Sequence, residues 1–202
     1  MRYKFYREHK YVSFMLTELE RLIAKTDFRD NTQLTRVKEQ LQQVTFLHQG
    51  HIRYEEDRLH TLLTNQGSTM HLVIEEDHRQ QENDLAQLQV QLLEIEKHPK
   101  QERVALSDSW YLAYRKFVCD VLIHLHVEET VILPELHRLY SDEQLRAVEF
   151  NTYAYSSPEQ MIHMIEILFP HMNTSDHDAF LLDMKEADPE KFALVLSKLN
   201  GI

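Results

Sequence analysis

Two short segments of this sequence each place a histidine four residues before a glutamate. They are His51-Ile-Arg-Tyr-Glu55 and His124-Leu-His-Val-Glu128. Residues four apart lie on one face of an α-helix, so each segment would present an imidazole and a carboxylate to the same point. Imidazole and carboxylate groups together bind iron, zinc and manganese ions. The two segments therefore indicate a metal site.

Two further histidines, His9 and His78, each precede one of these segments. His9 lies 42 residues before His51, and His78 lies 46 residues before His124, so the second half of the region approximately repeats the first. The order is thus a histidine, a His-x-x-x-Glu pair, a histidine and a second pair. The candidate metal ligands are His9, His51, Glu55, His78, His124 and Glu128.

Spacing alone does not separate a metal site from a solvated helix face. The chain has 13 histidines, and three more His-x-x-x-Glu pairs occur, at His71/Glu75, His78/Glu82 and His98/Glu102. The depth of each candidate along the bundle separates a metal site from a solvated face more clearly than spacing does. A helix rises about 1.5 Å per residue, so in four helices that run up and down the six candidates would lie toward the same end of the bundle, to within roughly two turns. Apolar residues flank His78 and His124 at core spacing: Ile74, Leu85, Phe117, Val121 and Val131.

The elements that must position these residues are long helices. Only 3 glycines and 5 prolines occur among 202 residues, and a chain with so few turn formers favours an all-α fold. Apolar periodicity predicts helices over about 3–25, 32–63, 69–97 and 101–140. Pro134 should kink or divide the fourth of these helices near Leu133. Residues 1–140 are therefore expected to form an antiparallel up-down-up-down four-helix bundle.

The tail, residues 141–202, contains three helix-start signals and is expected to form about four short helices. Ser141 to Gln144 and Ser157 to Gln160 have the sequence of capping boxes, and Asp188-Pro189 is a cap followed by proline. The segment is too short and too closely joined to suggest an independent unit. We expect a helical extension that packs on the bundle, so that the chain forms one structural domain overall.

The fourth predicted helix resembles the signature of hemerythrin-like (HHE cation-binding) proteins. His124-Leu-His-Val-Glu-Glu-Thr-Val-Ile-Leu-Pro134 matches its His-x-x-x-Glu-Glu, apolar pair and proline, and His51 to Glu56 matches the earlier copy. Glu76-Asp77-His78 and Glu8-His9 resemble the family's third and first helices. The resemblance covers residues 1–140 and implies a non-haem centre of two iron ions, oxo- or hydroxo-bridged, with zinc or manganese as alternatives.

The sequence also departs from the oxygen-carrying hemerythrins. Those proteins use His-x-x-x-His on the third helix and His-x-x-x-x-Asp on the fourth, whereas here residue 82 is glutamate and the fourth helix carries Glu128. A simple oxygen-carrier role is therefore not expected. The tail resembles the extension that follows hemerythrin-like modules of plant iron-regulated ubiquitin ligases, but no RING cysteines are present, so ligase activity does not carry over.

Composition excludes several classes of partner. The formal net charge of −11 would repel nucleic acid and anionic membranes, so neither is expected as a partner. The single cysteine, Cys119, cannot form an internal disulfide or a cysteine-based metal site. No secretory leader and no apolar run of membrane-spanning length is recognisable. These features predict a cytoplasmic protein.

Several neighbouring residues are alternatives to the chosen ligands. His71 is the strongest rival of His78, and Glu56 and Glu129 are possible extra ligands, although a neighbour at i+1 points about 100° away in a straight helix. His48 is expected outside the direct ligand set. His60 and the other histidines are expected at the surface, and Cys119 in the core.

These observations predict a di-iron protein that binds or senses a small ligand: dioxygen, nitric oxide, peroxide or iron itself. Four imidazoles with only two carboxylates favour reversible binding over the chemistry of carboxylate-rich oxidases. Two alternatives remain open. The same centre could be an oxidoreductase that turns over peroxide or nitrogen oxides, or the chain could be a metal-free helical interaction module.

Overall fold

The protein is all-helical, as the scarcity of turn residues predicts. A computed structural model describes residues 8–199; the chain is 87% helix, and no strand occurs in that range. Its contacts divide it into two units. The long-helix unit comprises residues 12–136, and the C-terminal unit comprises residues 137–199 together with residues 8–11. Each unit has its own buried core and is described separately below.

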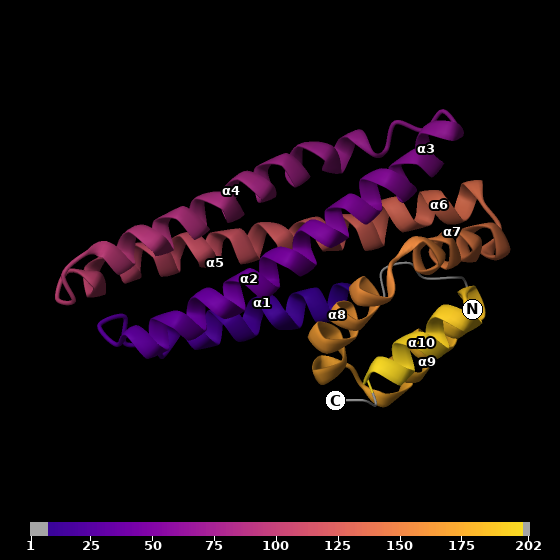
Figure 1. The fold of residues 1–202 in the computed structure, drawn as a ribbon. Helices are drawn as coiled ribbons and strands as arrows, with labels where there is room; N and C mark the ends of the chain where they lie inside the picture. The colour runs from indigo at the N-terminus through magenta and orange to yellow at the C-terminus, as the bar shows by residue number, and fades with distance from the viewer. Residues whose placement is uncertain (1–7, 200–202) are drawn as a thin grey trace. The chain divides into compact units, whose positions relative to one another are not determined.

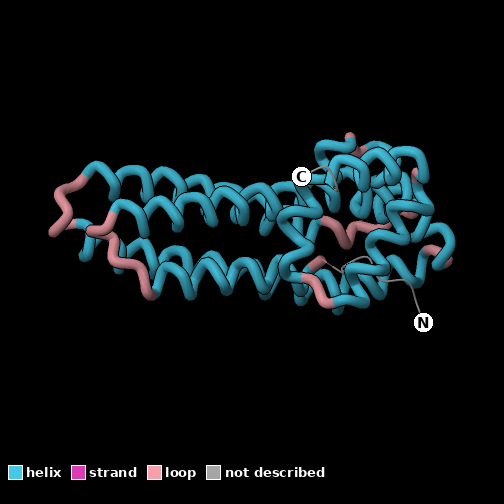
Figure 2. The backbone as a smooth tube through the Cα atoms, turned by 60° about the horizontal axis from the view of Figure 1, so that its bottom comes forward, coloured by secondary structure: helices cyan, strands magenta, loops and turns pink. Residues whose placement is uncertain are grey.

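Four long helices make up most of the long-helix unit. They are α1 (His9–Ala24, of which residues 12–24 belong here), α2 (Asn31–Tyr54), α4 (Leu72–Lys97) and α5 (Arg103–Val127). Figures 1 and 2 show them lying lengthwise beside one another, and α4 contacts both α2 and α5. Each helix buries one apolar stripe; in α1 the stripe is Val12, Leu16, Leu19 and Ile23.

Two of these helices continue through a short π-helical segment. The first, η1 (Glu55–His60), joins α2 to α3 (Thr61–Asn65), and the second, η2 (Glu128–Ile132), joins α5 to α6 (Leu133–Leu139). Each segment begins at the glutamate of a His-x-x-x-Glu pair. A π turn holds an extra residue compared with an α turn, and such turns are frequent at functional sites.

The π segments change which residues reach the core. A count of 3.6 residues per turn from Glu55 would place Leu62 on the same side of the helix, but Leu63 is buried instead. Val131 was expected beside His124 in the core; its side chain is 38% exposed, whereas Ile132 is fully buried. In both places the wide turn changes the helical phase, so a 3.6-residue count selects the wrong neighbour.

Local sequence signals set the ends of the long helices. The Asp30 side chain accepts hydrogen bonds from the backbone N–H groups of Thr32 and Gln33 and caps α2. Gly67 has a positive φ of 69°, and the backbone N–H of Ser68 donates to the Leu63 carbonyl at 3.0 Å, which closes α3 as a Schellman motif. The next long helix, α4, begins only at Leu72, so a turn separates it from Ser68.

Pro134 does not break the fourth long helix. It is the second residue of α6 and directly follows the π segment η2, so the N–H that proline lacks would have donated to a carbonyl of that segment. The helical path therefore continues from α5 through η2 into α6. The predicted division near Leu133 takes the form of a change from π to α geometry.

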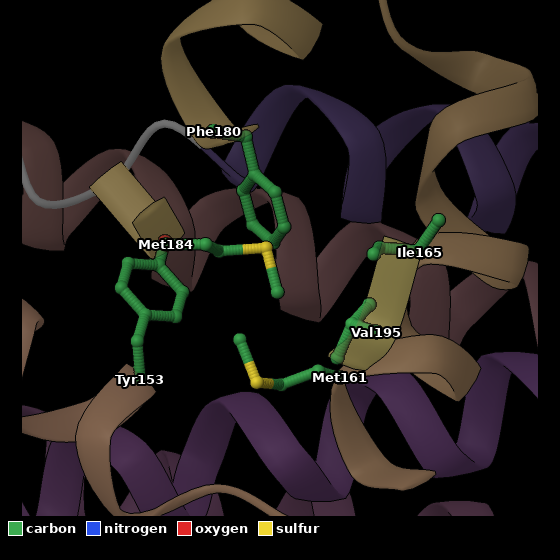
Figure 3. Packing of buried hydrophobic residues seen from close by; sticks show 6 residues of the cluster. All are labelled: Tyr153, Met161, Ile165, Phe180, Met184 and Val195. Carbon is green, nitrogen blue, oxygen red and sulfur yellow. The ribbon is translucent and has the colours of Figure 1, made fainter. Parts of the chain in front are cut away.

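The C-terminal unit contains the four short α-helices that the tail predicts. They are α7 (Asp142–Tyr155), α8 (Pro158–Leu168), α9 (Thr174–Ala187) and α10 (Pro189–Leu199), with a 3₁₀ turn, η3 (Phe169–His171), after α8. The Ser157–Gln160 capping box and the Asp188 cap are both present. Figure 3 shows the core that these helices enclose: Tyr153, Met161, Ile165, Phe180, Met184 and Val195. Packing of this tail on residues 1–140 stays a prediction.

Hydropathy gives one further result. Within residues 8–199, none of the helices has both the length and the apolar character required to cross a bilayer. The buried apolar residues instead form the cores of the two units.

Candidate metal centre

Five of the six predicted ligands come together in the core of the long-helix unit. The imidazoles are His51 near the end of α2, His78 on α4 and His124 near the end of α5; the carboxylates are Glu55 and Glu128, the first residues of the two π segments. None is more than 5% exposed. One atom each of Glu55, His78, His124 and Glu128 lies within 4.8 Å of all the others, and the same holds for His51, Glu55 and Glu128.

Each carboxylate reaches two groups of imidazoles. Glu55 places Oε1 3.4 Å from His51 Nε2 and Oε2 3.3 Å from His78 Nε2. Glu128 places Oε2 3.9 Å from His51 Nε2 and Oε1 3.1 Å from His124 Nε2. The cluster thus has a His51 side and a His78–His124 side, and both carboxylates contribute an oxygen to each. This distribution of donor atoms would allow two metal ions to share both carboxylates.

The two imidazoles of the His78–His124 side point at each other. Their Nε2 atoms are 3.0 Å apart. On the far side of each ring Nδ1 contacts a carboxylate: His78 Nδ1 lies 3.3 Å from Glu56 Oε1, and His124 Nδ1 lies 3.4 Å from Asp77 Oδ2. A carboxylate at Nδ1 fixes the tautomer so that Nδ1–H donates and Nε2 carries a lone pair.

Two inward lone pairs at 3.0 Å repel each other unless a cation lies between or beside them. A proton or a metal ion can supply that charge. Metal-binding histidines characteristically donate their second N–H to an outer carboxylate, which is the arrangement of His78 with Glu56 and of His124 with Asp77. Glu56 and Asp77 are 43% and 51% exposed, so they lie at the rim of the buried cluster. The inward ring nitrogens of His78 and His124, each with a carboxylate at its outer nitrogen, therefore suit a metal ion.

The charge states of the cluster agree with this fit. Burial raises the pKa of the Glu128 carboxyl, but contacts with His124 and His78 outweigh burial and hold the pKa well below its usual value. Burial lowers the pKa of His124, and contacts with Glu128 and Asp77 outweigh it and raise the pKa. Glu128 is therefore an ionised carboxylate inside the core, a state that requires a positive partner.

His9, the sixth predicted ligand, opens α1 and is 2% exposed. The division between the two units falls inside α1, between Tyr11 and Val12, so His9 belongs by its contacts to the C-terminal unit. The geometry above is accordingly that of the five residues of the long-helix unit, and the role of His9 stays a prediction.

Two buried polar residues lie beside the cluster: His48, which was expected outside the direct ligand set, and Gln81, which was not predicted. His48 is one turn before His51 and 1% exposed, and Gln81 is one turn after His78 and 2% exposed. Burial, and then the His51 imidazole, lower the pKa of His48 to about 3, so its ring is neutral. Within the described residues, neither ring nitrogen of His48 has a hydrogen-bond partner, and Gln81 Oε1 accepts no hydrogen bond. The spacing of three residues from His78 is the signal that could have identified Gln81.

Two other predictions about single residues are wrong. His60, expected at the surface, is 7% exposed, because it ends the π segment that starts at Glu55 and therefore faces the same side. Cys119, expected in the core, is exposed. It lies about 200° around the helix from the buried Phe117, which places it on the opposite face.

The rival ligand His71 lies outside the five-residue cluster. Its ring packs against His60, with ring centroids 5.7 Å apart, whereas His78 is fully buried among the other ligands. Glu56, also considered as a ligand, contacts the outer nitrogen of His78. Glu129 is exposed.

Comparison with known proteins leaves the function to be argued from this geometry. No family model, no curated protein and no solved structure matches the chain. The similarity to hemerythrin-like proteins therefore remains a prediction that rests on the residues quoted above. The description of the site rests on the distances, burial and charges given above.

Proposed function

We propose that this protein is a hemerythrin-like di-iron protein that reversibly binds or senses a small ligand. In this proposal the long helices form an antiparallel up-down-up-down four-helix bundle, and the cluster holds two metal ions. The observation that carries the proposal is the distribution of donors. Glu55 and Glu128 each offer one oxygen to His51 and the other to the His78–His124 side.

The donors divide between the two ions as follows. His78 and His124 would hold one ion, His51 and the predicted ligand His9 would hold the other, and Glu55 and Glu128 would be available to both. Each ion then receives four protein donors. Iron accepts up to six, so positions remain for an exogenous ligand, whereas a structural zinc ion would be satisfied by four. When bound, the iron pair supplies Lewis acidity and redox chemistry.

Residues around the cluster control what reaches it. The ligands are nearly fully buried, which excludes bulk water and large substrates. His48 and Gln81 add polar atoms with unused hydrogen-bonding capacity on one side. A neutral imidazole can donate one hydrogen bond and accept another, so His48 can orient a small polar molecule beside the cluster. Dioxygen, nitric oxide and peroxide are small enough for such an environment.

The experiment that tests this proposal is metal analysis of purified variants. His124→Ala, Glu128→Ala and His78→Ala should each lose iron, because each deletes a buried donor. His9→Ala should lose about one ion of two, if it completes the His51 side. His98→Ala is the matched control, because His98 forms an exposed pair with Glu102 and should matter to neither ion. His71→Ala should keep both ions of the cluster, because His71 lies outside it.

Other outcomes would select a different function. Two bound irons with the charge-transfer absorption of a diferric centre, together with reversible ligand binding, support the proposal. Sustained turnover of peroxide or nitric oxide by the loaded protein would establish the oxidoreductase alternative instead. Purification without stoichiometric metal from iron-rich medium, and no change in metal content for His78→Ala or His124→Ala, would leave a helical interaction module.

A further inference from the structure

A row of imidazoles leads away from the cluster. The ring of His60 stacks on that of His78, with centroids 5.5 Å apart and planes within 4°. The ring of His71 lies next, with its centroid 5.7 Å from that of His60. His60 is buried and His71 is half-buried. The row therefore runs from the buried ligand His78 to a residue that solvent reaches.

The outer two imidazoles have nitrogens that nothing else uses. His60 Nε2 and His71 Nδ1 are both inaccessible to solvent and have no hydrogen-bond partner among the described residues. An imidazole nitrogen without a hydrogen-bond partner can offer its lone pair to a metal ion. Leaving such atoms unsatisfied costs free energy, and a bound cation would recover it.

The π segment is the reason that His60 lies in this row. Glu55 and His60 are the first and last residues of η1 and are five apart, which is one turn of a π-helix. In an α-helix, residues five apart are roughly 140° apart around the axis. The wide turn thus brings His60 to the ligand side of the helix. His71 comes from a different segment, the turn that precedes α4.

The spacing of the two rings suits one ion. A ring nitrogen holds a metal ion at about 2.1 Å, and the ring centroid then lies roughly 3.2 Å from the ion, so two rings on one ion can be at most about 6.4 Å apart. The observed 5.7 Å between His60 and His71 is within this limit. Exposed carboxylates on the flanking turns, Asp57 and Glu75, give the approach a negative charge that attracts cations.

We propose that His60 and His71 form an accessory site for a divalent metal ion on its way to the buried cluster. The inference rests on the proposed function, because the ion's destination is the di-iron centre. Two imidazoles hold an ion more weakly than the four donors available inside. An ion that binds first at the half-buried His71 and His60 can therefore move inward to His78 with a gain in free energy.

The test uses metal-free protein and Co²⁺, whose absorption reports coordination. Equilibrium titration of the wild type should give two tightly bound ions and a third at least about tenfold weaker, since it has fewer protein donors. His71→Gln and His60→Phe should lose the third ion and keep the two tight ones. His60→Phe retains a ring against His78; His71→Gln alters a half-buried turn and should not affect folding.

Loading kinetics test the route. With Co²⁺ below stoichiometry, both variants should fill the tight sites about tenfold more slowly than wild type, because an acidic, ligand-lined approach raises the local ion concentration. His98→Gln removes an exposed histidine with a neighbouring carboxylate and should load at the wild-type rate. Loading of His71→Gln and His60→Phe at the wild-type rate, or a third ion that survives both changes, would overturn the inference.

These outcomes separate the inference from the proposed function. Two tight ions whose number and loading rate do not depend on His60 and His71 would refute the accessory site and leave the di-iron proposal standing. A wild type that binds no tight ion, yet binds a weak one that both variants lose, would refute the di-iron proposal and keep metal binding at His60 and His71.

Discussion

Replacing Asp77 by alanine should weaken metal binding without weakening the fold. Asp77 is not proposed as a ligand, and its side chain is 51% exposed. Its Oδ2 lies 3.4 Å from His124 Nδ1, where it accepts the hydrogen bond that turns the other ring nitrogen toward the cluster. Glu56→Ala should act in the same way on His78, whose Nδ1 lies 3.3 Å from Glu56 Oε1.

The expected magnitudes follow from exposure and geometry. A half-exposed charge pair contributes only about 0–1 kcal/mol to folding, because water screens it. Removing the outer carboxylate of a metal-bound imidazole typically weakens metal affinity by about 10–100-fold, or about 1.4–2.7 kcal/mol. His78 and His124 contact each other at 3.0 Å, so Asp77→Ala and Glu56→Ala should be non-additive when combined.

The assay separates the two effects. Metal affinity is measured by competition with a chromophoric chelator, and the fold by thermal unfolding of the metal-free protein followed by circular dichroism. Glu76→Ala is the matched control, because Glu76 is the neighbour of Asp77 on α4, its side chain is 70% exposed, and its partner is the surface residue Arg79. Its metal affinity should equal that of the wild type.

One result would refute the reasoning about tautomers. If Asp77→Ala and Glu56→Ala bind metal as tightly as Glu76→Ala, the Nδ1 contacts do not orient the imidazoles. The close approach of the two Nε2 atoms would then require a shared proton rather than a metal ion. A loss of metal affinity with an equal loss of stability in the metal-free form would instead indicate a packing defect.

Three further predictions concern stability. Saturating iron at about 100 times its Kd should stabilise the long-helix unit by about 2.7 kcal/mol, and a chelator should remove this gain, as measured by scanning calorimetry. Gly67→Ala should destabilise the long-helix unit by about 1 kcal/mol, because Gly67 has a φ of +69°. Gly50→Ala should stabilise its helix by about 0.5–1 kcal/mol, because no atom lies within 4 Å of the new Cβ. Equal effects of the two substitutions on the free energy of unfolding, measured by chemical denaturation, would contradict this. Met184→Ala should lower the free energy of unfolding of the C-terminal unit by about 2–5 kcal/mol, because it leaves a cavity in the core, and it should leave the iron content unchanged. A loss of iron would contradict the separation of the two cores.

Local chemistry is the part of this fold that sequence reasoning predicts well. Helix ends depend on a few adjacent residues, so the Ser157 capping box and the Asp188 cap could both be predicted from the sequence. The ligand pairs were readable for the same reason, because residues four apart share a helix face whatever the rest of the chain does. The pair His51/Glu55 accordingly lies on one side of the cluster, with 3.4 Å between Nε2 and Oε1.

The π segments are the part that sequence reasoning missed. No residue preference marks a π turn, and every estimate of facing and depth assumed 3.6 residues per turn. The errors follow from this assumption: Val131 was expected in the core, where Ile132 lies instead, and His60 was expected at the surface. Cys119 is different, because its exposure follows from the ordinary α-helical phase set by Phe117.

The wide turns also affect how this chain should be aligned with others. At Glu55–His60 and again at Glu128–Ile132 the chain carries one residue more than an uninterrupted α-helix over the same path would need. A relative built with plain α-helices there should align with a single-residue gap just after each His-x-x-x-Glu pair. Deleting one residue from η1 should convert it to that form and turn everything from His60 to Asn65 by about 100°. Insertions and deletions of one residue, which are ordinarily confined to loops, are therefore informative inside these two helices.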